Sequence, residues 1–330
     1  MVPSTNERWQ EARLSAPARL RNIKLAAMRL IELASGDAIL HVAAELGGAI
    51  VSYTWRRRPV LRPTPASAFA TRNVRLASCY PLVPYSNRIR NAMLSFHGRE
   101  YALGRNFGTH AHAIHGVGWQ RAWSIEAADA NRAQLTLVHD PLTDSASAWP
   151  WPFRAMQTFE LSSTDGAAVL STALTLDNTG AQPFPFGLGW HPFFAADAAT
   201  TVGFGAQAVW ENDATQLPVR RIAVPAGWPF RDARPLGGLA IDNVFAGWSG
   251  RADVTNASTG VRATLSADRA CGYLVVYAPA HADFVALEPV THETDAFNRS
   301  AAGAQDVGFR TLAPGCAFSC TMRVAVSAFH

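Results

Sequence analysis

The chain has 330 residues, of which 48% are hydrophobic and 16% are charged. This composition excludes a disordered protein and leaves enough apolar material for a substantial core. The formal net charge is +4, but apart from Lys24 the basic residues are arginines scattered along the chain. The tightest cluster, Arg56–Arg58, is short and is typical of a solvated strand end or turn. We therefore expect no nucleic-acid partner.

The first residues, 1–22, are expected to form a tail outside the fold, and residues 23–330 a single domain. No apolar run near the N-terminus is long enough for a signal peptide or a membrane span, so no membrane partner is expected. The four cysteines form no C-x-x-C pair. Cys316 and Cys320 lie on one face of a predicted strand, about 13 Å apart, which is too far for a disulfide. These features predict a reduced, cytoplasmic protein. No heptad or apolar strip indicates obligate assembly, so we expect a monomer or a weak homodimer.

The predicted secondary structure is mainly strand, with one short helical pattern before Ala34. The strand candidates, in chain order, are Ile39–Tyr53, Gln134–Val138, Leu170–Leu176, Tyr273–Tyr277, Phe284–Leu287 and Phe318–Val326. The last of these alternates apolar and polar residues with a period of two, as a half-buried antiparallel strand does. Many strands separated by Gly, Pro, Asn and Asp clusters predict an all-β sandwich or barrel.

Four segments place titratable groups among glycines, prolines and aromatic residues. They are residues 80–89 with Asn87 and Arg88, residues 112–119 with His115, residues 187–194 with His191, and residues 284–291 with Glu288. Arg88 and the two histidines are each also compatible with a structural role, as a strand-end cation, a turn residue or a hydrogen-bonded core histidine. A structural role is harder to assign to Glu288, because an apolar strand delivers this lone carboxylate directly before a proline. Buried acids are costly unless they are paired or functional.

Motifs for metals and cofactors are missing from the sequence. It contains no H-E-x-x-H, P-loop or G-x-S-x-G motif. His110 and His112 alone offer too few ligands to specify a metal site. Gly187 and Gly189 lack the third glycine of a dinucleotide fingerprint. We therefore expect no metal and no cofactor, and acid–base groups beside aromatic residues favour proton transfer on a polyhydroxylated ligand.

Taken in order, these segments resemble the aldose 1-epimerase (galactose mutarotase) family over about residues 28–327. The matching motifs are Pro84-Tyr-Ser-Asn-Arg-Ile89 with Phe96-His-Gly-Arg-Glu-Tyr101, His115-Gly116 with Trp119 and Trp123, His191-Pro-Phe-Phe194, Asp242-Asn-Val-Phe245, and Glu288-Pro-Val-Thr291 with Asp295-Ala-Phe-Asn298. Phe193 stands where the family usually has tyrosine. Trp149-Pro-Trp-Pro-Phe-Arg154 is more similar to a bacterial branch of uncharacterised members than to the well-studied galactose enzymes, which leaves the identity of the sugar open.

The resemblance implies a large antiparallel β supersandwich with an open sugar-binding cleft, no cofactor and a small sugar as substrate. It implies that Glu288 is the general base and His191 the general acid. It also implies that Arg88, His115 and Asp242 bind the sugar hydroxyls and the ring oxygen, and we count Asn87 with them.

Mutarotation requires that the sugar ring opens and closes. A base removes the proton of the anomeric O1 hydroxyl while an acid protonates the ring oxygen O5. Rotation about C1–C2 then presents the other carbonyl face, and the same two groups close the ring in reversed roles. We expect an ionised Glu288 and a protonated His191 near neutral pH. His115 could share the role at the ring oxygen.

Three rival functions are open to such a sequence. A hexose-phosphate 1-epimerase would need cations that converge on a phosphate, for which the candidates are Arg88, Arg90, Arg99, Arg121 and Arg154. A non-catalytic carbohydrate-binding protein would have no need for a matched acid and base. A glycoside hydrolase would need a second carboxylate opposite Glu288, and only Asp242 is available.

Overall fold

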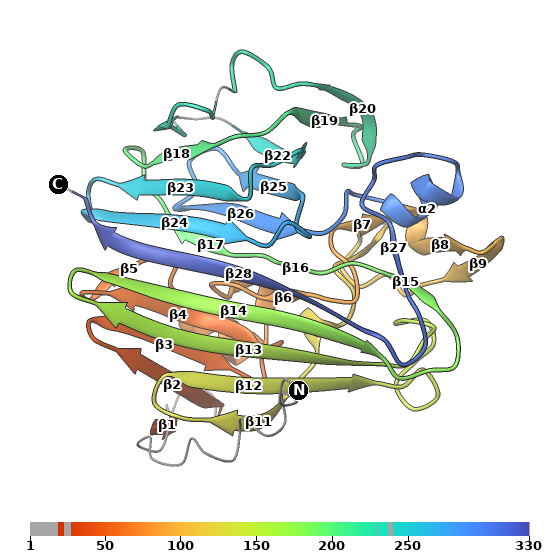
Figure 1. The fold of residues 1–330 in the computed structure, drawn as a ribbon, viewed down its shortest axis with the longest axis horizontal. Helices are drawn as coiled ribbons and strands as arrows, with labels where there is room; N and C mark the ends of the chain where they lie inside the picture. Colours follow the sequence, from red (N-terminus) through yellow and green to blue (C-terminus); the bar gives the residue numbers. More distant parts are fainter. Residues whose placement is uncertain (1–18, 23–27, 229, 237–239, 330) are drawn as a thin grey trace, which may run out of the picture.

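The structure is a computed structural model that describes residues 19–22, 28–228, 230–236 and 240–329. It contains three large sheets, and every pair of named strands in them is antiparallel. Figure 1 shows the long strands of the largest sheet side by side across the molecule. In spatial order this nine-stranded sheet consists of β11 (Ser124–Ala128), β12 (Arg132–His139), β13 (Phe153–Thr164), β14 (Ala167–Asn178), β28 (Ala317–Ala328), β24 (Val261–Ala267), β23 (Arg251–Asn256), β18 (Thr201–Phe204) and β21 (Arg234–Pro235).

The eight-stranded sheet carries most of the candidate site. In spatial order it consists of β20 (Pro218–Ala223), β19 (Ala208–Asn212), β22 (Ile241–Ala246), β25 (Tyr273–Ala278), β26 (Phe284–Val290), β16 (Gly189–Trp190) and β6 (Pro81–Leu82), and β17 (Phe193–Ala195) also pairs with β26. The five-stranded sheet consists of β1 (Arg19–Asn22), β2 (Arg29–Ser35), β3 (Ala38–Ala43), β4 (Ala49–Trp55) and β5 (Arg58–Pro59).

Short elements complete the described chain. Three two-stranded sheets pair β7 (Arg88–Ile89) with β10 (Ala113–Ile114), β8 (Met93–Phe96) with β9 (Arg99–Ala102), and β15 (Phe184–Phe186) with β27 (Arg310–Leu312). The helices are α1 (Ala66–Thr71) and α2 (Ala296–Ala301), with the 3₁₀ helices η2 (Val74–Leu76), η3 (Arg90–Ala92) and η4 (Gly118–Gln120). Within the described ranges, no helix has the length and apolar content needed to span a membrane.

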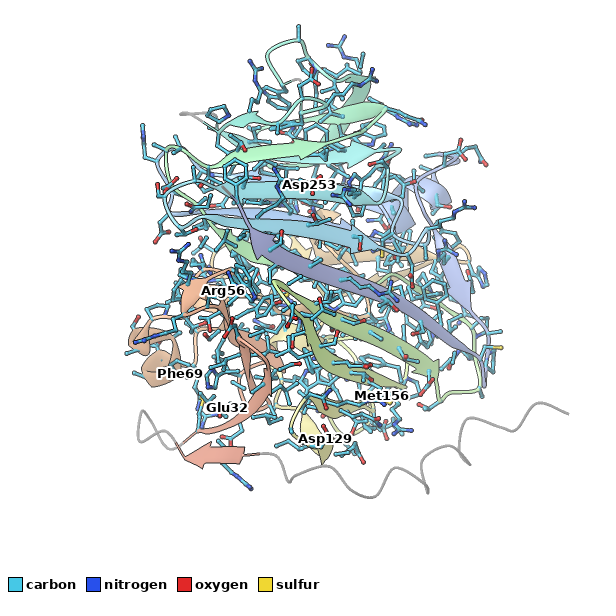
Figure 2. All side chains as sticks on the ribbon, turned by 60° about the vertical axis from the view of Figure 1, so that its left-hand side comes forward. Glu32, Arg56, Phe69, Asp129, Met156 and Asp253 are labelled. Carbon is cyan, nitrogen blue, oxygen red and sulfur yellow. The ribbon has the colours of Figure 1, made fainter. Side chains whose placement is uncertain are left out.

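One buried cluster joins the three sheets into a sandwich. It contains Leu40 of β3, Phe159 of β13 and Leu265 of β24 together with Leu274 and Val276 of β25. Figure 2 places Met156 of β13 and Asp253 of β23 on the same nine-stranded sheet, with side chains filling the space behind it. Burial of this apolar surface is the main force that holds the sheets together.

The predicted all-β architecture is confirmed, as is the antiparallel sandwich. The alternating segments Leu170–Leu176 and Phe318–Val326 lie within β14 and β28, the adjacent central strands of the largest sheet. All four cysteines are free, and Cys316 lies just before β28.

Three local expectations differ from the structure. The segment before Ala34 is strand β2, not a helix, because it pairs with β3 and buries Ile31 and Leu33. The stretch Ile39–Tyr53 is not one strand but the hairpin of β3 and β4, which turns at residues 44–48. In the predicted tail, residues 19–22 form strand β1 paired with β2, and residues 1–18 lie outside the described residues.

Candidate active site

Strands β22, β25 and β26 bring two predicted carboxylates to one face of the eight-stranded sheet. Glu288 of β26 lies opposite Val275 of β25, and Asp242 of β22 lies opposite Tyr277 of β25. Because side chains alternate along a strand, all four share a face. Leu274 points to the other face and belongs to the main core. The carboxylates therefore face away from the nine-stranded sheet.

His191 lies between β16 and β17, beside Glu288. Its backbone N–H donates to the carbonyl oxygen of Tyr80 at 3.0 Å. Its ring is stacked on that of Phe193, with ring centroids 4.3 Å apart and an angle of 19° between the planes. The Tyr80 ring packs nearby, with a centroid distance of 4.7 Å. These contacts hold the imidazole in one orientation.

Nε2 of His191 lies 3.1 Å from Oε1 of Glu288. Both side chains are almost completely buried. Burial raises the pKa of the Glu288 carboxyl well above its usual range, and the charge of Asp242 acts in the same direction. Burial also lowers the pKa of His191 well below its usual value, helped by His115 and Arg62.

These shifts run against the expectation of an ionised Glu288 and a protonated His191. Burial favours the neutral forms of both groups, so the free pair is best described as holding one proton on Glu288. The expected ion pair contains the same number of protons, and the 3.1 Å contact allows the proton to pass between the partners. The pair therefore still offers one acid and one base.

Asn87 and His115 fix each other by two reciprocal hydrogen bonds. The backbone N–H of Asn87 donates to Nδ1 of His115 at 3.0 Å, and the N–H of His115 donates to the carbonyl oxygen of Asn87 at 2.9 Å. Because Nδ1 accepts, the neutral ring carries its proton on Nε2. Burial lowers the pKa of His115 to about 3, so the ring stays neutral at physiological pH. His115 is therefore a fixed hydrogen-bond donor.

The backbone around these residues is constrained. Asn87 and His115 have φ values of +55° and +61°, a left-handed conformation that is uncommon for residues other than glycine. Gly116 follows with φ of +69°, and a Cβ atom there would lie 2.3 Å from the carbonyl oxygen of Val83. Such conformations persist only where the surrounding structure enforces them, and they cluster at functional sites.

Arg88 is held across the site from Glu288. Its Nη2 donates to Oδ2 of Asp242 at 3.3 Å, and its Nη1 donates to Oδ1 of Asn87 at 3.1 Å. The same oxygen of Asn87 accepts from the Arg88 backbone N–H at 2.9 Å. The guanidinium is thus oriented by two side chains that the sequence predicted as site residues.

The segment after β26 positions the Asn87–Arg88 loop, a role that the sequence did not reveal. Nε2 of His292 accepts from the backbone N–H of Ser86 at 3.1 Å. The N–H of Asp295 donates to the carbonyl oxygen of Arg88 at 2.9 Å, and Oδ1 of Asp295 accepts from the N–H of Arg90, also at 2.9 Å. The motif containing Asp295 was the only sequence signal of this contact. Strand β26 thus supplies Glu288, and the segment that follows it supports Arg88.

All six predicted site residues line a single cavity of about 350 Å³. They are Asn87, Arg88, His115, His191, Asp242 and Glu288. Phe193 lines this cavity, whereas Trp119 and Trp190 are buried outside its lining. Tyr80, Phe107, Tyr277 and Phe284 also line it. Tyr80 and Phe284 begin two of the predicted segments and Tyr277 ends a predicted strand, whereas the sequence had not singled out Phe107.

The five arginines considered for a phosphate site do not converge. Only Arg88 lines the cavity. Arg90 is paired with Asp295, and Arg121 with Asp144. Instead, Arg62 and Arg75, which the sequence did not single out, are part of the lining. Among the described residues, no group of three or more His, Cys, Asp and Glu side chains is placed to hold a metal ion.

This large antiparallel β sandwich has a galactose mutarotase-like fold. The aldose 1-epimerase family profile matches residues 29–325. The chain therefore belongs to the aldose 1-epimerase family.

Individual relatives agree with this assignment. The uncharacterised protein YphB of Escherichia coli strain K12 is 30% identical over 297 residues, which cover 87% of this chain and 95% of YphB. A crystal structure of a candidate aldose 1-epimerase from E. coli K12 superposes with a TM-score of 0.81 at 27% identity, covering 92% of this chain and all of that one. A galactose mutarotase-like protein from Clostridium acetobutylicum shares the fold, with a TM-score of 0.82 at 17% identity and coverage of 96% and 99%.

Proposed function

We propose that this protein is an aldose 1-epimerase that interconverts the α and β anomers of an aldose. The observation that carries this proposal is the buried contact of 3.1 Å between Glu288 and His191 on the wall of an open cavity. A binding protein has no need for a coupled acid and base in a place where burial is costly. Ring opening needs such a pair, because one proton must leave O1 while another reaches O5.

In this proposal Glu288 accepts the O1 proton and His191 donates a proton to O5. The pair enters this step as carboxylate and imidazolium, after the proton that the two groups share has moved from Glu288 to His191. Ring opening leaves a protonated Glu288 and a neutral His191, which is the arrangement that burial favours. Closure onto either face of the aldehyde then reverses the two transfers. Each positioned acid or base contributes roughly 10²–10⁴ in rate.

The two histidines take different roles. His191 contacts a carboxylate that can supply and recover a proton, whereas His115 stays neutral and has only its Nε2–H to offer. We therefore assign proton transfer to His191 and a hydrogen bond to a sugar oxygen to His115. Arg88 donates to neighbouring hydroxyls, Asp242 accepts from one, and the amide of Asn87 lies beside them.

Polarimetry on freshly dissolved α-D-glucose and α-D-galactose tests the proposal. The wild type should speed the approach to anomeric equilibrium, and Glu288→Gln should lose at least about 10² of that rate while keeping the fold by circular dichroism. Glu100→Gln, which changes an exposed carboxylate on β9, is the matched control and should behave as the wild type. Near-full turnover by Glu288→Gln would refute the assignment of the base. Saturable sugar binding without acceleration would instead identify a non-catalytic binding protein.

A further inference from the structure

Arg62 is a partly buried cation in the cavity wall. Its guanidinium lies over the rings of Phe193 and Phe284, with distances of 3.9 Å and 4.6 Å from Cζ to the ring centroids. Nη2 donates to the carbonyl oxygens of Arg75 and Ala77 at 3.0 Å and 2.8 Å. These contacts fix the side chain without neutralising its charge.

Arg62 has no acidic partner in the described part of the chain. No carboxylate of the described residues forms an ion pair with its guanidinium, and Nε is buried without a hydrogen-bond acceptor. Asp283 acts on it only at longer range. A desolvated charge without a counter-ion is costly, and such groups are expected mainly where a ligand supplies the missing charge.

A second arginine stands on the same side of the cavity. Arg75 is exposed, lines the cavity with Arg62, and lies over Phe107 at 4.7 Å from Cζ to the ring centroid. Within the described ranges it too forms no ion pair. Arg88, by contrast, forms an ion pair with Asp242 at 3.3 Å, although its Nε, like that of Arg62, is buried without a hydrogen-bond partner. The cavity lining thus has one arginine that is paired with a carboxylate and two, Arg62 and Arg75, that form no ion pair with the described residues.

We propose that Arg62 and Arg75 form an anion-binding subsite, and that the substrate is an aldose that carries a negatively charged substituent away from C1. This inference rests on the proposed epimerase function. Guanidinium groups are suited to phosphate and carboxylate, which accept two parallel hydrogen bonds. Stacking of both arginines on aromatic rings orients their N–H edges for such a ligand.

A comparison of neutral and anionic sugars as substrates tests the proposed subsite. Anomeric equilibration of α-D-glucose, α-D-glucose 6-phosphate and α-D-glucuronate is followed under identical conditions. We expect kcat/KM for at least one anionic sugar to exceed that for glucose by about tenfold or more, because a charge-assisted hydrogen bond is gained. Preference for the phosphate ester or for the carboxylate then identifies the anion. The preference should weaken as ionic strength rises.

The variants Arg75→Gln and Arg62→Gln connect this preference to the arginines. The ratio of anionic to neutral kcat/KM should fall at least about tenfold in Arg75→Gln. Arg72→Gln, which changes an exposed neighbour outside the cavity lining, should keep the wild-type ratio. Calorimetry with inorganic phosphate gives a readout that does not depend on catalysis, and binding should be lost in Arg75→Gln.

The possible outcomes separate the two proposals. Equal kcat/KM for neutral and anionic sugars would refute the anion-binding subsite but would not contradict the proposed epimerase function. A preference that survives in both arginine variants would also overturn it. No acceleration of any sugar would contradict the epimerase function and, with it, the substrate inferred here, whereas phosphate binding would still report on the arginine pair.

Discussion

The neutral, buried His115 makes the stability of the protein sensitive to acid. In the unfolded chain a histidine titrates near its ordinary pKa of 6.5, whereas burial lowers the pKa of His115 to about 3. Between these two values the unfolded chain binds more protons than the native one, so stability is lost as pH falls from 6.5 towards 3. From pH 7.5 to pH 4.5 this single group costs about 2.7 kcal/mol of unfolding free energy.

The substitution His115→Asn isolates this contribution. Asparagine tolerates the left-handed backbone of position 115, where φ is +61°, and its Oδ1 can replace Nδ1 as acceptor for the Asn87 N–H. The variant does not titrate, so its unfolding free energy should fall by about 2.7 kcal/mol less than that of the wild type between the two pH values. Urea unfolding at pH 7.5 and pH 4.5, followed by tryptophan fluorescence, measures the difference.

A second histidine provides the matched control. His97 is exposed and also has a positive φ, +50°, so His97→Asn makes the same chemical change in the same backbone conformation. That variant should lose as much stability as the wild type on acidification. Equal pH dependence in His115→Asn and the wild type would refute the buried neutral state of His115.

Three further outcomes follow from the site. Because burial raises the pKa of Glu288, the wild type loses stability as pH rises through that pKa. The variant Glu288→Gln lacks this titration, so its stability relative to the wild type should increase between pH 5 and pH 8 in thermal unfolding. Because the pKa of His191 is lowered, kcat/KM should show no acidic break at 6.5, and a break there in the pH–rate profile would contradict the buried pair. Asn298 accepts from the Ser95 N–H at 2.7 Å and donates at 2.7 Å to Oδ1 of Asp295, the oxygen that also accepts from the Arg90 N–H. Asn298→Ala should therefore cost about 1–3 kcal/mol of unfolding free energy and raise KM by loosening the Arg88 loop. Unchanged KM despite the lost stability would show that this support is only structural.

The fold was predictable where burial on one face leaves a pattern in the sequence. Strand β28 alternates because Cys320, Met322 and Val324 face the core while Arg323 does not. Strand β2 was mistaken for a helix because its apolar residues satisfy both periods, and only pairing with its neighbours decides between them. The hairpin of β3 and β4 was missed although Gly47 and Gly48 mark its turn with positive φ.

The site was predictable as a set of residues but not as a geometry. Glu288 and His191 are 97 positions apart, and a separation in sequence does not give a distance in space. The motifs nevertheless identified both residues. The sequence did not identify Arg62 or Arg75 as site residues, because Arg62 is an ordinary cation in a loop and Arg75 one in a short helix. What distinguishes them is that both line the cavity without an ion pair in the described structure, which is a relation in space that no local pattern records.

Protonation is the point at which sequence reasoning contradicted itself. It treated Glu288 as a buried or pocket-facing acid and yet assumed an ionised one, although burial opposes the charge. With the Glu288–His191 pair holding one proton in its neutral form and His115 neutral, the charges that remain in the cavity lining are those of Arg62, Arg75 and Arg88 against that of Asp242. Three positive groups facing one negative group give the cavity an excess of positive charge before any ligand enters. A neutral hexose would leave that excess unbalanced, whereas an aldose with an anionic substituent would offset it, and this holds whichever member of the Glu288–His191 pair carries the shared proton.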